Sequence, residues 1–559
     1  MILHIILFSF FFLTLSPLTW LKNIKSRTFI GWQLLRFIIG LGYSSFIFYW
    51  KLTDQTLLAY YSNFAWIIAI LVIIDYFIYK DSLLTFGAIA GVGVLVLNAY
   101  LWFIYPMTIA ADKYKVAAAE VSEKKLEAMN EERLPIVPRK YARYKAEKIL
   151  GKVDNYFYYD LGNSTIQKID DQLYWVTPLE YKGFFRWLKG DEIPGYIRVS
   201  AEDHRDEAKF IEAPMKYTPS AWFGENLHRK VRLQYPDIVL QGTSFEPDEK
   251  GKPYYVVTYG SYHNYRSVHQ VEGAILVDPQ TGKMKSYALE EVPAFVDRVI
   301  PEWMAIQRNH WFGKYKHGFL NSIFGKRDVH LPTEWGGEDE VVAVFDRNLN
   351  MYWFTDHTRA EEESGAMVGY TMMDTRTGKM TYYTGANGLL NGNAAANVVE
   401  KTFREKQWRG ANPVLYNIFG QYTWVVTALD SNGVFRQVMF VNATDEKVTG
   451  AGNAKGEALN NYQYAISTEL ESEDVIPTQA ATPIKRTGKV IAVYKSPGPD
   501  GQVIVQFMIE DYPEIYSLQS SKFPYAVFLE KGHEVSFEYL DTKQKTVALK
   551  SFENKTLGY

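Results

Sequence analysis

The sequence contains no cysteine among its 559 residues. This excludes disulfide scaffolds, thiol nucleophiles, iron–sulfur clusters and zinc sites built from cysteine. The chain also lacks an excess of either charge, because 60 Lys and Arg face 63 Asp and Glu, which gives a formal net charge of −3. A protein that binds nucleic acid normally carries a clustered basic excess, so we expect no nucleic-acid partner.

Hydrophobic residues make up 47% of the chain, which excludes disorder over most of its length. The first 111 residues contain four apolar stretches, 1–21, 28–50, 55–74 and 82–111. A membrane helix needs about 20 apolar residues, so the sequence predicts a transmembrane domain of four helices over residues 1–111. The first stretch has no basic n-region and no small-residue cleavage site, so we interpret it as a retained helix and not as a signal peptide.

Basic residues between the first two stretches predict the orientation of this domain. Lys22, Lys25 and Arg27 form the only strong basic cluster among these loops, with no acidic residue between them. The positive-inside rule places such a loop in the cytoplasm. We therefore expect a multi-pass protein of the plasma membrane, with its N-terminus and the large C-terminal part after Asp112 on the extracytoplasmic side.

Two ionisable residues, Arg36 and Asp75, lie within the membrane region and are expected in its cytoplasmic half. An ion pair between them would relieve the cost of burying either charge alone. Such a pair is either a proton or ion relay or a clamp between helices, and we favour the clamp because a transporter normally has more polar groups and broken helices. Gly87 and Gly91 have the GxxxG spacing that permits close helix packing or dimerisation.

Two polar segments are expected to connect the larger parts of the chain. Residues 112–134 are rich in Ala, Glu and Lys, which is typical of a solvated helix, and they predict a helical stalk that Pro135 and Pro138 end. Residues 469–486 contain two prolines and predict a linker.

Between the stalk and the linker, residues 135–468 repeat one layout four times. An aromatic β-run is followed by a polar interval and by a second apolar run that ends in an acidic or amide turn. The paired runs are 174–177 with 195–199, 254–258 with 273–278, 352–355 with 369–374, and 422–427 with 438–442. Helix-patterned segments accompany these units at 139–150, 224–235, 294–307 and 394–406. We expect tandem α+β units, each a helix packed on a small antiparallel sheet.

The second and third units share a turn of the pattern Asp-x-x-Thr-Gly-Lys-Met. Asp278 and Asp374 are expected to cap the bend with their side chains, while Gly282 and Gly378 supply a positive φ. Through these turns and the strands that lead into them, the region resembles the PepSY family of small extracytoplasmic modules. The resemblance implies a non-catalytic, protein-binding or regulatory module at the cell envelope, and it transfers no active-site residue. Units one and four depart from this turn pattern.

The last part of the chain, residues 487–559, consists of short alternating strands joined by turns. This pattern predicts a small β-barrel of the OB or SH3-like type. Such barrels bind many kinds of ligand, so the fold alone does not choose among them.

The sequence offers no catalytic arrangement. It has no Walker A loop and no G-x-S-x-G motif, and its ten histidines lack the spacing of known metal-ligand motifs. We therefore expect no catalytic residue, no metal and no cofactor. In the aromatic and basic segment 303–326, Trp311, Lys314 and Lys316 are candidate contacts for anionic wall polymer or lipid headgroups, and packing of the aromatic residues in the core is the alternative.

These features favour a non-enzymatic, membrane-anchored protein of the cell envelope. Its repeats would form a binding or assembly platform for other envelope proteins or for further copies of itself, since repeated edge strands invite pairing. The first alternative is a subunit or regulator of a transport or secretion complex, whose helices would join a pore. A wall-active hydrolase is the third hypothesis, for which we find no carboxylate or nucleophile arrangement.

Overall fold

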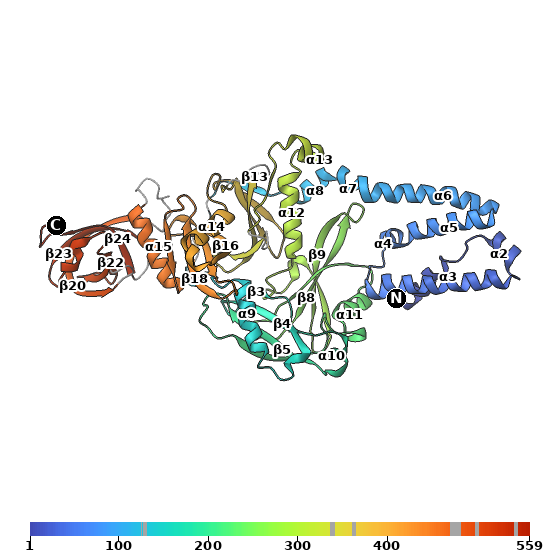
Figure 1. Cartoon of the computed structure of the whole chain (residues 1–559), viewed down its shortest axis with the longest axis horizontal. Coiled ribbons are helices and arrows are strands. Elements are labelled where there is room, and N and C mark those ends of the chain that lie inside the picture. The colour runs from blue at the N-terminus through green and yellow to red at the C-terminus, as the bar shows by residue number, and fades with distance from the viewer. Residues whose placement is uncertain are drawn as a thin grey trace.

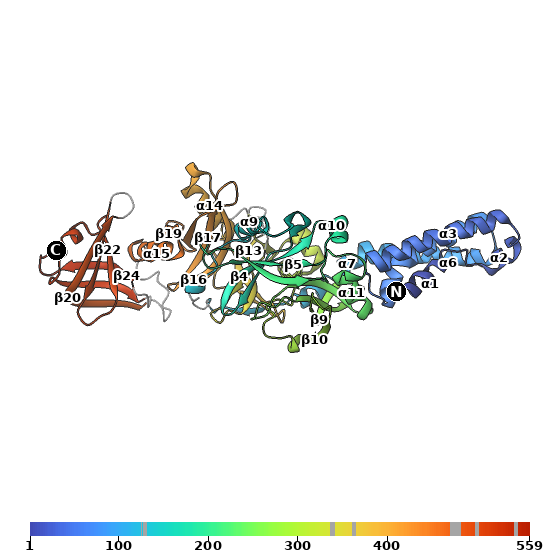
Figure 2. The same cartoon turned by 90° about the horizontal axis from the view of Figure 1, so that it is seen from below.

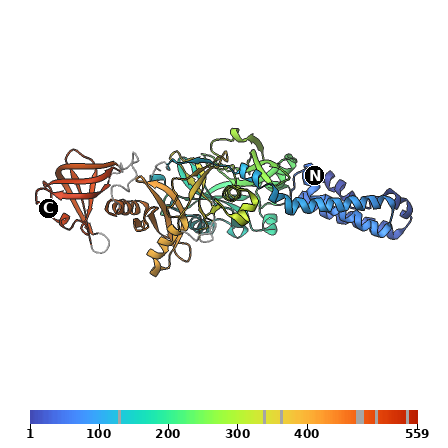
Figure 3. The ribbon, with the colours of Figure 1, turned by 90° about the horizontal axis from the view of Figure 1, so that it is seen from above.

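The computed structural model of the chain describes residues 1–124, 126, 131–335, 341–359, 365–469, 482–497, 502–541 and 546–559. The molecule is long and narrow, with helices at one end and a β-barrel at the other (Figures 1 and 2). Several small sheets lie between the two ends, and the view from above shows the same order along the long axis (Figure 3).

The helices at the first end are built from the apolar N-terminal region. They are α1 (Ile2–Phe10), α2 (Pro17–Asn23), α3 (Arg27–Ser45), α4 (Leu57–Tyr60), α5 (Trp66–Tyr79), α6 (Ser82–Ala99), α7 (Tyr105–Thr108) and α8 (Ala110–Val116). Short π-helical segments extend α3 and connect α4 to α5 and α6 to α7, which produces three helices long and apolar enough to cross a membrane. These candidate spans are Arg27–Trp50, Leu57–Tyr79 and Ser82–Thr108.

The prediction of four membrane helices is therefore wrong, because the first apolar stretch does not form one long helix. Helix α1 has nine residues, which at 1.5 Å per residue is about half of a bilayer core of about 30 Å. Residues 11–16 are not helical. Ser16 then accepts a hydrogen bond from the backbone N–H of Thr19 and caps a new helix that begins at Pro17. Apolar composition gave no sign of this break.

Four sheets follow in chain order, one in each of the four repeated segments, which we call units one to four. Unit one contains β2 (Tyr159–Leu161), β3 (Thr165–Ile169), β4 (Gln172–Tyr181), β5 (Ile193–Ser200) and β6 (Lys209–Met215). Unit two contains β7 (Val239–Phe245), β8 (Tyr255–His263), β9 (Val268–Val277) and β10 (Met284–Ala288). Unit three contains β11 (His330–Pro332), β12 (Val342–Phe345), β13 (Met351–Arg359), β14 (Gly369–Asp374) and β15 (Met380–Tyr383). Unit four contains β16 (Arg409–Ile418), β17 (Gln421–Leu429), β18 (Phe435–Asn442) and β19 (Thr449–Gly452).

Each unit also has a helix ahead of its main hairpin. These helices are α9 (Arg139–Leu150), α11 (Leu227–Gln234), α12 (Glu302–Lys314) and α14 (Gly392–Thr402), with the shorter α10 (Phe184–Lys189) and α13 (Gly318–Leu320) in units one and three, and α15 (Lys455–Glu469) after unit four. In unit four the buried residues Ala395, Val398 and Val399 recur at helical spacing on α14, so this face of the helix packs against the sheet.

The main hairpins pair the strands that the repeated layout predicts. Strands β4 and β5, β8 and β9, β13 and β14, and β17 and β18 are antiparallel neighbours. Strand β17 is buried at all nine positions, as expected for a central strand that is covered on both faces. Unit two lies nearest the membrane helices and unit four nearest the barrel (Figure 1).

One backbone contact recurs in all four units, including the two whose turn sequence departs from the pattern. A carbonyl one or two residues after the second hairpin strand accepts hydrogen bonds from the segment ahead of the unit's helix. The carbonyls of Ala201, Pro279 and Thr375 each accept two N–H groups, from residues 136–137, 216–217 and 299–300, and Ala443 accepts one from Leu390. The recurrence supports the division into four units.

An indole repeats this relationship in three of the units. Trp175, Trp353 and Trp424 occupy the same position in their hairpins. Their Nε1–H groups donate to the carbonyls of Val137, Ile300 and Leu390, at 2.7, 2.9 and 2.8 Å. Each indole therefore connects its hairpin to the segment just ahead of the unit's helix.

The units share one continuous hydrophobic core, whereas the barrel has its own. Buried side chains from α9 through α15 belong to the shared core, so the units are not independently packed domains. A residue in a continuous core cannot move without disturbing its neighbours, because protein interiors are close-packed. We infer that units one to four behave as one body, which we call the sheet domain.

The stalk prediction is wrong for the described residues. Helix α8 ends at Val116, and β1 (Glu120–Ser122) pairs in parallel with β15 of unit three. The helix-forming composition is overridden because the backbone of this segment completes a sheet edge. Most of the predicted linker, residues 470–481, lies outside the described residues, and the strand β20 (Thr482–Pro497) already begins within its last part.

The C-terminal barrel is confirmed. Five strands, β20, β21 (Val503–Ile509), β22 (Ile515–Gln519), β23 (Glu534–Asp541) and β24 (Thr546–Asn554), close in the order β20-β21-β22-β24-β23. Strands β22 and β24 pair in parallel, and the others pair antiparallel. This is a closed five-stranded barrel of Greek-key type, the architecture of OB-folds. Its core is filled by alternating residues such as Val505, Phe507 and Phe537.

Candidate functional site

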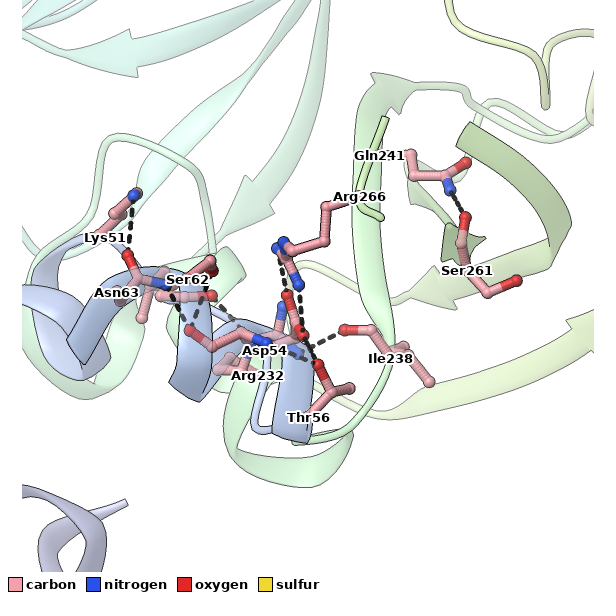
Figure 4. A network of polar contacts seen from close by, with 12 residues as sticks. Lys51, Asp54, Thr56, Ser62, Asn63, Arg232, Ile238, Gln241, Ser261 and Arg266 are labelled. Atoms are coloured by element: carbon pink, nitrogen blue, oxygen red, sulfur yellow. Dashed lines mark hydrogen bonds and ion pairs between the residues drawn. The ribbon is translucent and has the colours of Figure 1, made fainter. Parts of the chain in front are cut away.

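The loop between the first two membrane spans is bound to unit two by a buried ion pair (Figure 4). The guanidinium of Arg266, between β8 and β9, donates two hydrogen bonds to the carboxylate of Asp54, at 3.0 and 2.8 Å. Thr56 donates a third, at 2.6 Å. Asp54 is only 3% exposed. Burial by itself would raise the pKa of Asp54, but the hydrogen bonds from Arg266 and Thr56 and the positive charges nearby outweigh it and lower the pKa.

Arg232 of α11 binds the same loop from the opposite side. Its Nε–H donates to the carbonyl of Leu52 at 2.9 Å, and its Nη1 donates to three carbonyls in the segment just after its own helix, including that of Pro236. Pro236 in turn accepts the backbone N–H of Gln55 at 2.9 Å. The buried guanidinium therefore joins the loop and unit two into one hydrogen-bonded network (Figure 4).

A second attachment lies where the last membrane span enters the sheet domain. Helix α8 packs against α12 of unit three. The ring of Tyr114 stacks on Phe312, with 6.2 Å between centroids, and the ammonium of Lys113 lies 5.8 Å from the ring centre of Trp311. Burial lowers the pKa of Lys113. Asp112 also accepts a hydrogen bond from Asn264 of unit two, at 3.2 Å.

The two attachments together fix the membrane helices to the sheet domain. A single contact would leave a hinge, but contacts from the loop 51–56 to unit two and from α8 to units two and three restrict rotation about either one. This arrangement has no reacting groups. What it can do is hold orientation, or pass a displacement of the helices on to the sheets.

Inside the membrane region, the predicted partners Arg36 and Asp75 are in contact. Arg36 Nη1 lies 2.6 Å from Asp75 Oδ1, and both residues are buried. Arg36 also donates to the carbonyl of Phe12 at 2.6 Å and to the hydroxyl of Thr14 at 3.1 Å. Arg36 of this pair thus supplies hydrogen bonds to the non-helical segment 11–16, whose backbone groups need partners within a membrane.

Gln33 completes the contacts to this segment. Its Oε1 accepts the backbone N–H of Thr14, and its Nε2 donates to the Thr14 hydroxyl, both at 3.0 Å. Two buried atoms are left without a hydrogen-bond partner among the described residues, Nη2 of Arg36 and Oδ2 of Asp75. Chemically, this pair can clamp the broken segment.

At the end of the helices far from the sheet domain, Asp81 ties the broken segment to the turn between α5 and α6. It accepts hydrogen bonds from the hydroxyls of Ser16 and Thr19, at 2.5 and 2.7 Å. It also caps α6 by accepting the backbone N–H of Leu83 at 2.7 Å. These hydrogen bonds hold the pKa of Asp81 at about 2.

The predicted helix-packing glycines face α5 of the same chain. A Cβ at Gly87 would lie 2.8 Å from Val72, and one at Gly91 would lie 3.1 Å from the carbonyl of Ala69. The close approach that GxxxG permits is therefore used within the protein.

The two predicted repeat turns have the same geometry. The carboxylates of Asp278 and Asp374 each accept the backbone N–H groups two and three residues ahead, at 2.7 to 3.1 Å. Gly282 and Gly378 adopt φ of 69° and 74°. In unit four, Asn442 accepts the equivalent two N–H groups through its amide oxygen. The amide oxygen takes the place of the carboxylate oxygen, so unit four keeps the same bend although its turn sequence differs.

An anionic contact at Trp311, Lys314 and Lys316 stays a prediction, although Trp311 itself is buried. Trp311 is a buried residue of α12 whose ring lies beside the ammonium of Lys113, and Lys316 pairs with Asp328 at 3.6 Å. Lys314 lies in the last turn of α12. The alternative interpretation, core packing of the aromatic residues, describes Trp311 correctly.

Sequence reasoning missed two clusters. One is the network of Asp54, Arg232 and Arg266, which brings together charged residues of two short loops and of helix α11 that no local pattern connects. The other is a histidine pair in unit three, buried His357 and partly buried His330, whose Nδ1 atoms are 2.9 Å apart. Burial lowers the pKa of His330 to about 4. Among the described residues, no group of three or more His, Asp or Glu side chains is placed to hold a metal ion.

Comparisons with known proteins add little to this geometry. No protein-family model and no curated protein matches the chain. Among solved structures, an exo-β-1,3-galactanase from Clostridium thermocellum matches over 70% of this chain and 68% of its own, with 6% sequence identity and a TM-score of 0.19. A score this low does not establish a common fold, so nothing about activity follows from it.

Proposed function

We propose that this chain is a membrane-anchored protein of the cell envelope whose four units form a rigid, non-enzymatic platform for binding and assembly. The observation that carries the proposal is the double attachment of the helices to units two and three. Because the four units share a core, fixing units two and three relative to the membrane helices also fixes the orientation of unit four. The barrel lies at the end farthest from the helices, where a binding module is best presented (Figure 1).

The proposal places the sheet domain and barrel on the extracytoplasmic side. The basic residues Lys22, Lys25 and Arg27 lie at the end of the helices far from the sheet domain, and the positive-inside rule assigns that end to the cytoplasm. With three spans in place of four, the sheet domain is still on the opposite side from this cluster. The recurring turn contacts support PepSY-like units as part of the same proposal.

The experiment is photo-crosslinking in intact cells from the exposed surface of the barrel. Tyr525 and Phe528 are each 59% exposed and are suited to replacement by a photoreactive phenylalanine. We expect adducts with another envelope protein or with a second copy of the chain. A matched position near the cytoplasmic turn, Leu21, should give none of these adducts. Absence of adducts from both barrel positions, with the protein inserted and folded, would contradict the platform.

A second candidate function is regulation of, or participation in, a transport complex. The broken segment 11–16 and the Arg36–Asp75 pair favour it, because transporters place interrupted helices at their ion sites. The test is proton flux into liposomes that contain the full chain. The platform proposal predicts no flux above that of empty liposomes, whereas a transport role predicts flux that Asp75→Asn abolishes.

A further inference from the structure

A cavity of about 270 Å³ lies where units one, three and four meet. The first turn of α9 and strands β3 and β4 supply one wall, β12 and β13 supply another, and Asn412 of β16 reaches it from unit four. Asn412 sits in a β-bulge with a φ of 50°. Bulges often redirect a side chain toward a functional site. No residue of this cavity belongs to the attachments described above.

Three tryptophans line the cavity, and none offers a polar group to it. The Nε1–H groups of Trp175 and Trp353 are bound to the carbonyls of Val137 and Ile300, and that of Trp335 donates to Asp356 at 3.0 Å. The indoles therefore contribute apolar aromatic surface alone. Such surface is suited to the flat C–H face of a sugar ring or to another planar group.

The charged side chains of the lining are all cationic among the described residues. They are Arg139, Lys140, Arg143 and Arg298. Two of them begin α9, which has Pro138 at its N-cap, no side-chain cap and no acidic residue in its first turn. Cations at this end of a helix add to the positive end of the dipole, where an anion would be favourable. The α9 terminus thus presents positive charge to the cavity, and Glu302 balances the part that Arg139 contributes.

The guanidinium of Arg298 has no hydrogen bond or ion pair to a described residue, although Glu246 and Glu302 lie close enough to act on its charge. Burial lowers the pKa of Arg298, and these two carboxylates act in the opposite direction. Arg298 lies 5.7 Å from the ring centre of Trp353 and also borders a second hollow beside Trp303. Arg139, by contrast, already pairs with Glu302 at 3.2 Å, and Arg143 donates to two backbone carbonyls. Because none of its N–H groups is taken by a hydrogen bond to a described residue, the half-buried Arg298 guanidinium is available to bind an anionic oxygen of a ligand.

We propose that this cavity binds an anionic sugar, with Arg298 and the first turn of α9 holding its carboxylate or phosphate and the indoles packing on its ring. The volume admits a single ring and not an extended chain, so the ligand is either a free sugar acid or the terminal residue of an anionic polymer. The inference does not depend on the platform proposal, because binding is expected whichever partner the barrel has.

The test is calorimetric titration of the full chain in nanodiscs with glucuronate, glucose and acetate. Glucose lacks the carboxylate and acetate lacks the ring, so each control removes one half of the proposed recognition. We expect glucuronate to bind at least tenfold more tightly than either. An oligosaccharide of three glucuronate units separates the two sources: tighter binding than glucuronate identifies a polymer end, and equal or weaker binding identifies a free sugar acid.

Variants locate the site. Arg298→Gln should weaken glucuronate binding at least tenfold, and Arg327→Gln, an exposed arginine away from the cavity, should leave it unchanged. Lys140→Gln is a second variant at an exposed position that should fold normally and weaken binding severalfold. Near-ultraviolet circular dichroism checks the fold. The proposal is overturned if glucuronate does not bind, if acetate or glucose binds equally well, or if both cavity variants bind like the unaltered protein.

Discussion

The contact between Arg266 and Asp54 should determine how often the loop 51–56 detaches from unit two. Arg266→Gln removes two charge-assisted hydrogen bonds, of 3.0 and 2.8 Å, and leaves a carboxylate that is 3% exposed without its ionic partner. Each such bond contributes about 1.5–3 kcal/mol net. Thr56 still donates to Asp54 and the loop can relax, so we expect the free energy of detachment to fall by about 2–3 kcal/mol.

Hydrogen exchange measures this quantity directly, because the backbone N–H of Gln55 is bonded to Pro236 across the attachment. In the full chain in nanodiscs, peptides that contain Gln55 should exchange about 30- to 150-fold faster in Arg266→Gln, at about 1.4 kcal/mol per tenfold. Lys51→Gln is the control, since it removes only an exposed 3.3 Å bond to Asn63 and should change exchange less than about threefold. A change below threefold for Arg266→Gln would refute the reasoning.

Three further predictions concern packing and pH. Gly91→Leu should lower the melting temperature, because its Cβ would press on Ala69 of α5, whereas Gly93→Leu on the open side of α6 should not. Gly378→Ala forces a non-glycine residue to a φ of 74° and should cost about 1–2 kcal/mol in the free energy of unfolding, measured by denaturant titration. Lowering the pH from 6.5 toward 4 protonates His330 in the unfolded chain first, because burial lowers its folded pKa to about 4; stability should therefore fall over this range, by up to about 3 kcal/mol, and the fall in melting temperature should be smaller in His330→Gln.

Much of the sheet domain could be predicted because local sequence determines it. Residues 139–150 form α9, and the aromatic runs pair as the main hairpins, since alternating apolar side chains and turn residues act over short distances. The bends at Asp278 and Asp374 could be predicted because a single aspartate side chain caps such a turn and a glycine supplies its positive φ. The barrel followed from the spacing of its strands.

The errors arose where tertiary contacts decide. The first apolar stretch is composed like a membrane helix, but Gln33 and Arg36 from α3 supply partners for an interrupted backbone, and Ser16 with Pro17 begins a new helix. The stalk composition favours helix, but unit three offers a strand edge at β15. The attachment formed by Asp54 and Arg266 joins residues 212 positions apart, and no local pattern links them.

The central claim is that the sheet domain and barrel lie on the opposite side of the membrane from the basic turn. Because the chain has no cysteine, Lys25→Cys and Lys531→Cys, both at exposed positions, each introduce one thiol. A membrane-impermeant maleimide is added to intact cells beside an extracytoplasmic reference protein. The account predicts labelling of Lys531→Cys in intact cells and of Lys25→Cys only after permeabilisation, and the reverse pattern would contradict it.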